Sequence, residues 1–508
     1  MSTPQQPKAA ITPTRTENYA EWYQQVVRAS DMAELSGVRG CMILKPNGYG
    51  IWELMRDYLD ASFKESGHEN YYFPLFIPLS YFQKEADHVE GFAKEMAVVT
   101  HHRLTSKDGA LCPDGELEEP LIVRPTSETV IGTAMAKWIK SYRDLPLLLN
   151  QWANVVRWEM RPRILLRTTE FLWQEGHTAH ETREEAMQET LQILEVYRVF
   201  AEEVLALPVI TGTKPPHERF PGAVETFTIE SMMQDGRALQ GGTSHYLGQN
   251  FSKSLDIQFQ TREGSLAHVH TTSWGVSTRL LGALVMVHSD DNGMRTPPRV
   301  APWQVVIVPV LRNDGDSESV LAYCEKLRVE LGTQTYANGK VRVRVDKRDI
   351  SGADKKWDWI KKGAPLILEI GPKDVAAEKV CLLRRDQLDA GKRFLERRAF
   401  IEGVSAELAS IQQNLFDQAL TFQKARTHTH IKTREAFDAY FSKDSGNSFS
   451  TDQGFVRAKW SGDPASLALL DERGVTIRCI PLDQSGEEGF CVLTGQPATQ
   501  EVIFARAY

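Results

Sequence analysis

Residues 150–180 read NQWANVVRWEMRPRILLRTTEFLWQEGHTAH, and this stretch decides how the middle of the chain folds. Residues 151–158 and 168–173 are rich in Val, Trp, Phe and Leu, which predicts two strands joined as a hairpin. Arg157 and Arg167 belong to the expected strands, and the loop between them holds Arg161, Pro162 and Arg163. The centre of the chain is therefore expected to contain a hairpin with four arginines around its turn.

These arginines have few acids nearby to pair with. An arginine-rich hairpin is often only a solvated surface, but a guanidinium group also binds phosphate oxygens bidentately. Glu159 lies two residues from Arg157, on the same face of the expected strand. The apolar run that follows carries polar groups that would need buried partners if they pointed inward: Trp173, Gln174, Glu175, His177 and His180. Together these features favour a phosphate clamp.

Length and composition set the limits for the whole chain. A chain of 508 residues is too long for one core, so two or three domains are expected. Apolar residues make up 42% and charged residues 25%, as in soluble globular proteins. No run approaches the roughly 18 apolar residues of a membrane span, and the start of the chain lacks the apolar core of a signal peptide. The six cysteines form no paired framework, which predicts a reducing, cytoplasmic location.

The net charge of −8 does not by itself suggest a nucleic acid partner. Basic runs occur at 340–362 and 384–398, but acids lie among them, so solvated faces explain them equally well. Charge alone leaves the function open.

Five ordered blocks of the sequence resemble a known family. RWE at 157–159 followed by LRTTEFLWQEGHTAH from Leu166 resembles the second signature motif of class II aminoacyl-tRNA synthetases, in the form that prolyl-tRNA synthetases carry. The other blocks are RGCMILKPNGYGIWE from Arg39, RPTSE from Arg124, LQGGTSHYLGQNF from Leu239 and SWGVSTR from Ser273. The resemblance runs from about residue 18 to the C-terminus, and five ordered blocks are far more specific than one short motif.

The resemblance implies an α+β architecture in three domains. An antiparallel-sheet catalytic domain is expected over 18–299, an α/β anticodon-binding domain over 300–402 and a small α+β C-terminal domain over 403–508, after a flexible lead-in at 1–17. Alternating strands and helices over 305–384 independently predict a small α/β domain with a largely parallel sheet. Only about sixty residues separate His180 from Leu239, which leaves no room for the editing domain of bacterial-type relatives. The chain therefore resembles the archaeal and eukaryotic type.

Local patterns predict elements around these blocks. Asn18 is expected to open an amphipathic helix. A turn-rich stretch at 40–50 is expected to precede a helix at 51–64, and a strand is expected to follow at 71–79. The resemblance makes that helix–strand pair a dimer interface. Short strands are expected at 95–100 and 121–123 with a loop at 112–119. A helix at 126–142 would be capped by Thr126 and Ser127, and a capping box at Thr182 would start a helix that runs to about Ala206.

The proline end of the expected site follows from the resemblance. Thr126 and Glu128 would receive the charged secondary amine, which has two N–H donors and needs two acceptors. Phe171, Trp173 and Trp274 would wall a small apolar pocket. The complete set expected to bind proline is Thr126, Glu128, Arg157, Phe171, Trp173, Glu175, His177, His245, Ser273 and Trp274. Such a pocket discriminates poorly against smaller side chains, so activation of alanine is also expected.

The resemblance also implies an ATP site. Arg157 and Arg279 are the expected catalytic arginines, because Arg157 would hold the α-phosphate and Arg279 would lie near adenine and the γ-phosphate. Gly241 and Gly242 would allow the backbone to approach a ligand closely, although a bulge explains them too. The complete expected set is Arg157, Glu159, Arg167, Thr168, Gln240, Thr243, Ser277 and Arg279. Mg²⁺ is expected to bridge phosphate oxygens, with Glu230 or Gln240 as candidate protein ligands.

The expected C-terminal domain departs from its relatives. They bind zinc there through four cysteines, whereas this chain has only Cys491 at the last pair and no cysteine in 455–464. Four ligands are needed for a structural zinc site, so no metal is expected. His428 and His430 are expected to face solvent. Tyr508 matches a C-terminal tyrosine that reaches towards the active site in relatives, but a free end is an alternative.

The implied function is ATP-dependent ligation of proline to its tRNA by a cytoplasmic homodimer, without membrane or DNA partners. Two alternatives compete with this interpretation. A catalytically silent RNA-binding relative would be expected to lose some of Glu128, Arg157 and Arg279, and all three are present. Threonine enzymes of this class hold a zinc ion through Cys and His ligands that this chain lacks at the matching positions.

Overall fold

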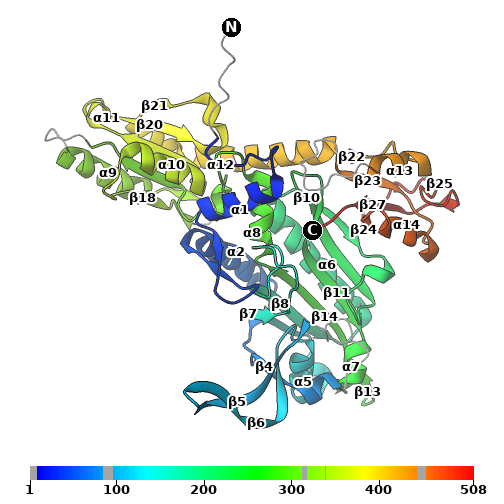
Figure 1. Ribbon diagram of the computed structural model, residues 1–508. Coiled ribbons are helices and arrows are strands. Elements are labelled where there is room, and N and C mark those ends of the chain that lie inside the picture. Colours follow the sequence, from blue (N-terminus) through cyan, green and yellow to red (C-terminus); the bar gives the residue numbers. More distant parts are fainter. Residues whose placement is uncertain (1–8, 84–94, 312–316, 338, 443–452) are drawn as a thin grey trace.

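The computed structural model describes residues 9–83, 95–311, 317–337, 339–442 and 453–508. Its centre is an antiparallel sheet in the order β9-β10-β11-β14-β8-β7. These strands are β7 (Leu147–Val156), β8 (Glu170–His180), β9 (Ile210–Thr213), β10 (Glu225–Met232), β11 (Ala238–Gly248) and β14 (His270–Ser277). The expected antiparallel catalytic sheet is therefore present, and Figure 1 shows it in the middle of the molecule.

The hairpin predicted from residues 150–180 is formed by β7 and β8. Its register runs from Leu147 opposite Ala179 to Val156 opposite Glu170. Both strands are longer than predicted at the ends away from the turn. Near the turn they are shorter, because β7 ends before Arg157 and β8 begins after Arg167. Arg157 and Glu159 lie after the last residue of β7, so the expectation that they share a strand face was wrong.

The helices α6 (Arg183–Val199) and α8 (Arg279–His288) pack against the central sheet. α1 (Tyr19–Ala29) packs against α8, and α2 (Pro46–Glu65) contacts β7 through the rings of Trp52 and Trp152. The Asn18 side chain caps α1, and the capping box at Thr182 opens α6, both as predicted. α6 ends at Val199 and a single π-turn, η3 (Phe200–Val204), continues it. α2 begins at Pro46, inside the expected turn-rich stretch, because proline is well tolerated in the first turn of a helix.

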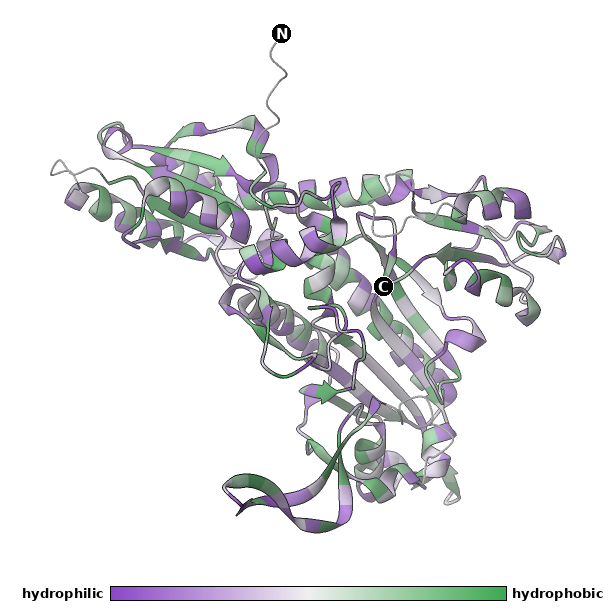
Figure 2. Ribbon diagram, in the orientation of Figure 1, coloured by the Kyte–Doolittle hydropathy of each residue, from purple (hydrophilic) through white to green (hydrophobic). Residues whose placement is uncertain are grey.

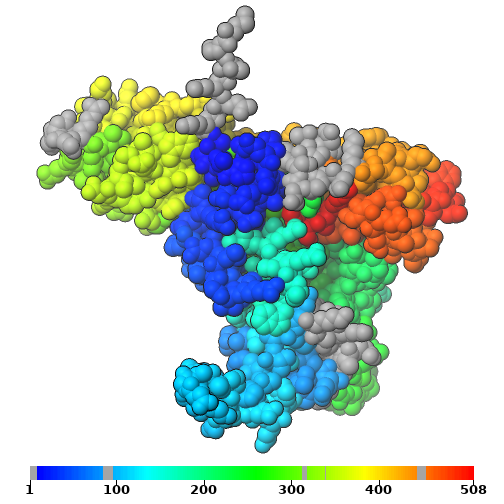
Figure 3. Space-filling view, viewed as in Figure 1, coloured from blue at the N-terminus to red at the C-terminus, as the bar shows by residue number. Residues whose placement is uncertain are grey.

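Of the strand expected at 71–79 only residues 76–78 form one, β4 (Phe76–Pro78), and the short strand β3 (Glu69–Asn70) lies just before the expected range. A long antiparallel hairpin of β5 (Ala97–Lys107) and β6 (Ala110–Val123) replaces the two short strands and loop expected nearby. Its polar sequence concealed it, because both of its faces are largely exposed. Figures 1 and 3 show it projecting from the body of the molecule.

The helix expected at 126–142 is α5 (Glu128–Trp138), and its predicted capping is wrong. Ser127 is the N-cap residue but caps nothing, because its hydroxyl donates to Glu175 instead. The Thr126 hydroxyl donates to the Glu128 carboxylate. Both side chains are thus committed to buried polar contacts at the start of the helix.

Residues 305–396 form the predicted α/β unit around a five-stranded sheet, in the order β18-β15-β19-β20-β21. Its strands are β15 (Val305–Pro309), β18 (Val343–Val345), β19 (Leu366–Ile370), β20 (Lys379–Arg384) and β21 (Arg393–Glu396), with helices α9 (Ser317–Leu331), α10 (Gly352–Lys362) and α11 (Pro372–Ala376). β15 pairs in parallel with β18 and β19, whereas β20 is antiparallel to both of its neighbours. The sheet is therefore mixed rather than largely parallel. Figure 2 shows the hydrophobic residues along its strands.

α12 (Arg397–Ala425) runs across the molecule from this unit to the C-terminal region, so it spans the expected boundary at 402/403 (Figure 1). The C-terminal region contains β22 (Thr427–His428), α13 (Arg434–Phe441), β23 (Phe455–Lys459), α14 (Ala468–Asp471), β24 (Thr476–Pro481) and β27 (Glu501–Ala505). Its four main strands do not form a separate sheet, although β25 (Gly489–Phe490) and β26 (Pro497–Ala498) pair with each other. β24 pairs with β9, so β22-β23-β27-β24 extends the central sheet to eleven strands, with β3 at the other edge.

The lead-in expected at 1–17 is ordered in its described part. Ile11 is buried and donates its backbone N–H to Asp291 O at 2.9 Å. Arg15 forms an ion pair with the Asp291 side chain. Residues 9–17 therefore pack against the segment after α8, whereas residues 1–8 lie outside the described part of the chain.

Candidate active site

One cavity of about 240 Å³ lies on the central sheet, where β8, β10, β11 and β14 meet the starts of α5 and α8. All ten residues expected to bind proline line it, and so do five of the eight expected to bind ATP. The lining set from the prediction is Thr126, Glu128, Arg157, Phe171, Trp173, Glu175, His177, Gln240, Thr243, His245, Ser273, Trp274, Ser277 and Arg279. Segments more than 150 residues apart in sequence thus build one site.

The acidic end of the cavity is organised by Glu175. This buried carboxylate accepts hydrogen bonds from Ser127 Oγ at 2.6 Å and Gln151 Nε2 at 2.8 Å, and it contacts His177 Nε2 at 3.0 Å. Burial by itself would raise the pKa of Glu175, but the hydrogen bonds outweigh it and hold the pKa below its usual value. Glu175 is therefore a fixed anion that orients its neighbours.

The two histidines of the cavity differ in charge. Burial opposes protonation of His177, but the hydrogen bond to Glu175 and the charges of Glu128 and Glu175 raise its pKa above the usual value. Burial and the nearby His177 lower the pKa of His245 to about 3. Neutral His245 contacts Thr226 through Nδ1 at 3.0 Å and lies beside the Phe220 ring. The cavity thus offers one imidazole that readily becomes cationic and one that stays neutral.

The apolar wall of the cavity depends on Trp274. This side chain is almost fully buried and packs against Phe63 and His68, with ring centroids 4.9 and 5.1 Å away. A Cβ atom on Gly176 would lie 2.2 Å from the Trp274 ring, so only glycine fits there. Three buried polar atoms of the cavity residues have no hydrogen-bond partner in the described chain: Trp173 Nε1, Ser273 Oγ and Trp274 Nε1. Such groups are rare in folded proteins, and a bound molecule would give them partners.

Two arginines face the cavity from opposite segments. Arg157 donates from Nε to Pro125 O at 2.9 Å, and its guanidinium lies 5.6 Å from the Phe171 ring and 5.5 Å from the Trp173 ring. Arg279, the first residue of α8, donates from Nε to Leu166 O at 3.2 Å. Burial, followed by the charges of Arg157, Arg167 and Arg478, lowers the pKa of Arg279 to about 10. The guanidinium groups repel one another, and an anionic ligand between them would relieve this repulsion.

Three residues expected at the ATP site do not line this cavity. Arg167 is largely exposed and forms an ion pair with Glu159. The Thr168 hydroxyl donates to Glu170 O at 2.8 Å and is buried in the turn. All three lie in the loop between β7 and β8, beside the cavity rather than in its wall.

Glu230 does not face the cavity as a free carboxylate. Its oxygens accept bonds from Lys214 Nζ at 2.7 Å and from Arg478 Nε and Nη2, each at 3.1 Å. A carboxylate saturated by two cations is a poor ligand for Mg²⁺, so this arrangement does not favour Glu230 as a metal ligand. Gln240 remains in the cavity wall. Within the described residues, no group of three or more His, Cys, Asp or Glu side chains could hold a metal ion.

The sequence reasoning missed one part of the wall. Glu218, Arg219 and Phe220 follow β9 and line the cavity beside His245. They come from the stretch KPPHERFPG at 214–222, which has no helix or strand periodicity. Its prolines and its mixture of charged and aromatic residues are the only local signal of a functional loop.

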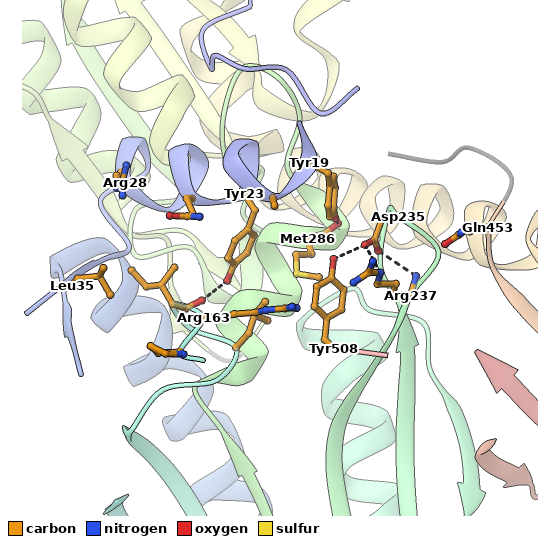
Figure 4. A pocket seen from close by; sticks show the side chains of 15 residues that line it. Tyr19, Tyr23, Arg28, Leu35, Arg163, Asp235, Arg237, Met286, Gln453 and Tyr508 are labelled. Carbon is orange, nitrogen blue, oxygen red and sulfur yellow. Dashed lines mark hydrogen bonds and ion pairs between the residues drawn. The ribbon is translucent and has the colours of Figure 1, made fainter. Parts of the chain in front are cut away.

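Tyr508 is docked rather than free, but it does not enter this cavity. Its hydroxyl donates to Asp235 Oδ2 at 2.5 Å, and its ring lies between the guanidinium groups of Arg163 and Arg237 at 5.7 and 5.5 Å. It lines a second cavity of about 240 Å³ together with Tyr19, as Figure 4 shows. The C-terminus therefore contacts the loop between β7 and β8 from outside the candidate active site.

The cysteine that the resemblance matches to a zinc site of relatives lies among protein side chains. Cys491 is buried beside Ser461 and Thr494. Burial would raise its pKa, but hydrogen bonds from Thr494 and Ser461 lower it. All six cysteines are free thiols. His428, expected to face solvent, is half-buried against Tyr440, with ring centroids 5.0 Å apart.

No helix among the described residues is both long and apolar enough to span a bilayer. Comparison with known families matches residues 112–288 to the class II core domain of the tRNA synthetases for Gly, His, Pro, Ser and Thr. Residues 304–405 match an anticodon-binding domain, and residues 447–508 match a prolyl-tRNA synthetase C-terminal domain.

Similarity to curated proteins extends over the whole chain. It is 60% identical to a proline–tRNA ligase of Paramagnetospirillum magneticum over 501 residues, which cover 99% of both chains. Proline–tRNA ligases of Protochlamydia amoebophila and Rhodopirellula baltica are 57% and 56% identical, with 99% and 98% of their lengths covered. The chain therefore belongs to the prolyl-tRNA synthetase family of class II aminoacyl-tRNA synthetases.

Proposed function

We propose that this protein activates proline with ATP and transfers it to the 3′ end of the proline tRNA. The family supports this reaction. The observation that carries the proposal at the level of the site is the single cavity that joins Arg157 and Arg279 to the Glu128–Thr126 pair and to an aromatic wall. The two arginines suit the phosphates of a nucleotide. The Glu128–Thr126 pair and the aromatic wall suit a cyclic, cationic imino acid.

In the first step, the proline carboxylate attacks the α-phosphate of ATP and pyrophosphate leaves. Thr126 and Glu128 hold the ring nitrogen, and Phe171, Trp173 and Trp274 enclose the ring. Arg157 holds the α-phosphate and the carboxylate together, while Arg279 faces the outer phosphates. This mechanism needs no enzyme nucleophile, because alignment and charge placement provide the catalysis. In the second step a terminal ribose hydroxyl of the tRNA attacks the adenylate, and AMP leaves.

Mg²⁺ fits this site as an ion held chiefly by the phosphate oxygens. Gln240 and Thr243 supply neutral oxygen atoms in the cavity wall, whereas Glu230 is occupied by Lys214 and Arg478. When bound, the ion would neutralise phosphate charge. The loop between β7 and β8 holds three further residues expected to bind ATP: Glu159, Arg167 and Thr168. They would contact the nucleotide only if this loop closed over it. In the structure Arg167 and Glu159 form an ion pair with each other within the loop.

A homodimer is part of the proposal. Large apolar side chains are exposed in the segments before and after α2 and at the start of the β5–β6 hairpin: Leu35, Val38, Ile43, Tyr72, Phe76 and Val98. Exposed apolar side chains are covered when they belong to a protein interface, which supports this part of the proposal. The substrates ATP and tRNA support a cytoplasmic location. The separate apolar cores of residues 305–415 and 431–504 support the proposed division into catalytic, anticodon-binding and C-terminal domains.

The direct test is ATP–pyrophosphate exchange with each of the twenty amino acids. Proline should drive the fastest exchange, and another amino acid driving it faster would refute the specificity. Arg157→Ala should lose on the order of 3 kcal/mol of transition-state stabilisation, a factor of 100 or more. Arg143→Ala is the matched control, because Arg143 is exposed and remote from the cavity lining. Exchange by the Arg157 variant at the parent rate would contradict the assigned role.

The pocket should also admit alanine, because a wall of apolar rings rejects a smaller side chain by only about 1–3 kcal/mol per methylene. We expect measurable alanine-dependent exchange at high alanine concentration. Exchange indistinguishable from the amino-acid-free blank would show that the wall discriminates more sharply than this.

A further inference from the structure

Three ionic side chains from distant segments meet in the interior next to the candidate active site. Lys214 follows β9, Glu230 belongs to β10 and Arg478 belongs to β24 of the C-terminal region. Their relative exposures are 2%, 0% and 8%. Lys214 Nζ also donates to Arg478 O at 2.6 Å. We call these three residues the buried triad.

The triad lies on the same sheet surface as the cavity. Glu230 is directly opposite Gln240 in the β10–β11 register, and Thr228 is opposite Thr243. Gln240 and Thr243 both line the cavity, and the Thr228 hydroxyl donates to Glu230 Oε1 at 3.2 Å. One row of cross-strand neighbours therefore separates the triad from the place where the nucleotide is proposed to bind.

Stability alone is a weak reason for such an arrangement. Removing ions from water costs several kcal/mol each, and apolar residues of similar size often replace buried ion pairs without loss. The triad holds two cations and one anion, so it also places a net positive charge in the interior. Arg478 is the residue that creates this excess, since Lys214 alone would only balance Glu230.

We propose that Arg478, which comes from the C-terminal domain, is a positioning residue of the ATP site. By binding Glu230 through two nitrogen atoms, it keeps that carboxylate turned into the triad and cancels its repulsion of the ATP phosphates. This inference rests on the proposed function. It assigns to the C-terminal domain a direct electrostatic part in the activation of the amino acid, in addition to any contact with tRNA.

The test is ATP–pyrophosphate exchange by Arg478→Met and Arg478→Lys, with KM measured separately for ATP and for proline. Methionine keeps the packing volume but removes the charge, so KM for ATP should rise about tenfold while KM for proline stays within about twofold of the parent. Lysine keeps the charge and should restore most of the affinity for ATP. Arg457→Met is the matched control, because Arg457 pairs with Glu501 on the neighbouring strands of the same domain.

Glu230→Gln provides a second variant with the opposite expected sign. It removes the one negative charge of the triad and should lower KM for ATP, whereas a merely structural triad would lose activity and thermal stability in both variants. Equal KM values for ATP in the parent and the folded Arg478→Met protein would overturn the inference. So would a rise in KM for ATP in Glu230→Gln, because the carboxylate would then serve the nucleotide itself. Failure of the parent to exchange with proline would instead refute the proposed function.

Discussion

The two regions that flank the catalytic sheet are attached to it in different ways. The C-terminal region joins through its backbone, because β24 pairs with β9 and its strands continue the central sheet. The α/β unit joins through side chains and loops. Arg385 donates from Nη1 and Nη2 to the Asp290 carboxylate at 2.8 and 2.6 Å, just beyond the end of α8. Gln412 of α12 donates to Glu203 O and Val204 O behind the sheet.

This difference suggests a division of roles. A continuous sheet holds two regions in one orientation, because a shift would break a row of backbone hydrogen bonds. The α/β unit is joined by side chains and by loop backbone hydrogen bonds such as Met294 N to Lys361 O at 3.0 Å, and a junction of this kind allows small movements at lower cost. The C-terminal region is thus suited to fix the cavity, while the α/β unit is suited to adjust to a bound tRNA.

The largest expected effect comes from breaking the sheet junction. A Cβ atom on Gly212 would lie 2.6 Å from Ile480 O and 2.7 Å from Cys479 Cβ. Gly212→Val should therefore separate β9 from β24 and cost about 3 kcal/mol. We expect a lower thermal midpoint and a loss of proline-dependent exchange. Gly403→Ala in α12 is the control, because a Cβ atom there meets nothing within 4 Å and alanine favours a helix. A Gly212 variant with parental exchange would show that the strand pairing is dispensable.

Breaking the side-chain junction should have a smaller effect, and on a different step. Arg385→Met leaves the Asp290 carboxylate with the Asn292 N–H at 2.8 Å and the weaker Arg295 contact at 3.8 Å. The loss should cost about 2 kcal/mol because Asp290 is partly exposed. Exchange should stay close to the parent, whereas aminoacylation of tRNA should fall several-fold. Equal losses in the two assays would mean that this junction also holds the cavity in place.

The third expected effect concerns pH. Burial and the nearby Arg295 lower the pKa of His288 to about 3, and its Nε2 contacts Leu205 O at 2.9 Å behind this junction. The unfolded imidazole takes up a proton below about pH 6.5 but the folded one does not. Stability is therefore fully present above pH 6.5 and falls between pH 6.5 and 3, by up to about 1.4 kcal/mol per pH unit.

The corresponding measurement is the thermal midpoint of the parent and of His288→Gln between pH 7.5 and 5. The midpoint of the variant should depend less on pH. Parallel curves for the two proteins would show that this histidine does not contribute to acid sensitivity.

Much of the candidate site could be predicted because its motifs are local. Arg157, Trp173, Glu175 and His177 lie within one hairpin, where residue type and alternation determine which side chains share a surface. The β5–β6 hairpin was missed for the converse reason, since a two-stranded ribbon exposed on both faces has no apolar alternation to reveal it. The prediction that Ser127 caps α5 was wrong because the Ser127 hydroxyl donates instead to the buried carboxylate of Glu175, which is far away in sequence.

The amino-acid sequence by itself determined the family, the central hairpin and the set of residues that surrounds the proline end of the cavity. Each depends on a short motif whose residue types carry their own chemistry. Only the tertiary structure decided that β24 extends the catalytic sheet, that Lys214 and Arg478 enclose Glu230, and that Arg167 turns to Glu159. These are pairings between segments up to 269 residues apart, from Gly212 to Pro481, and strand pairing and burial select them by geometry that no local pattern encodes.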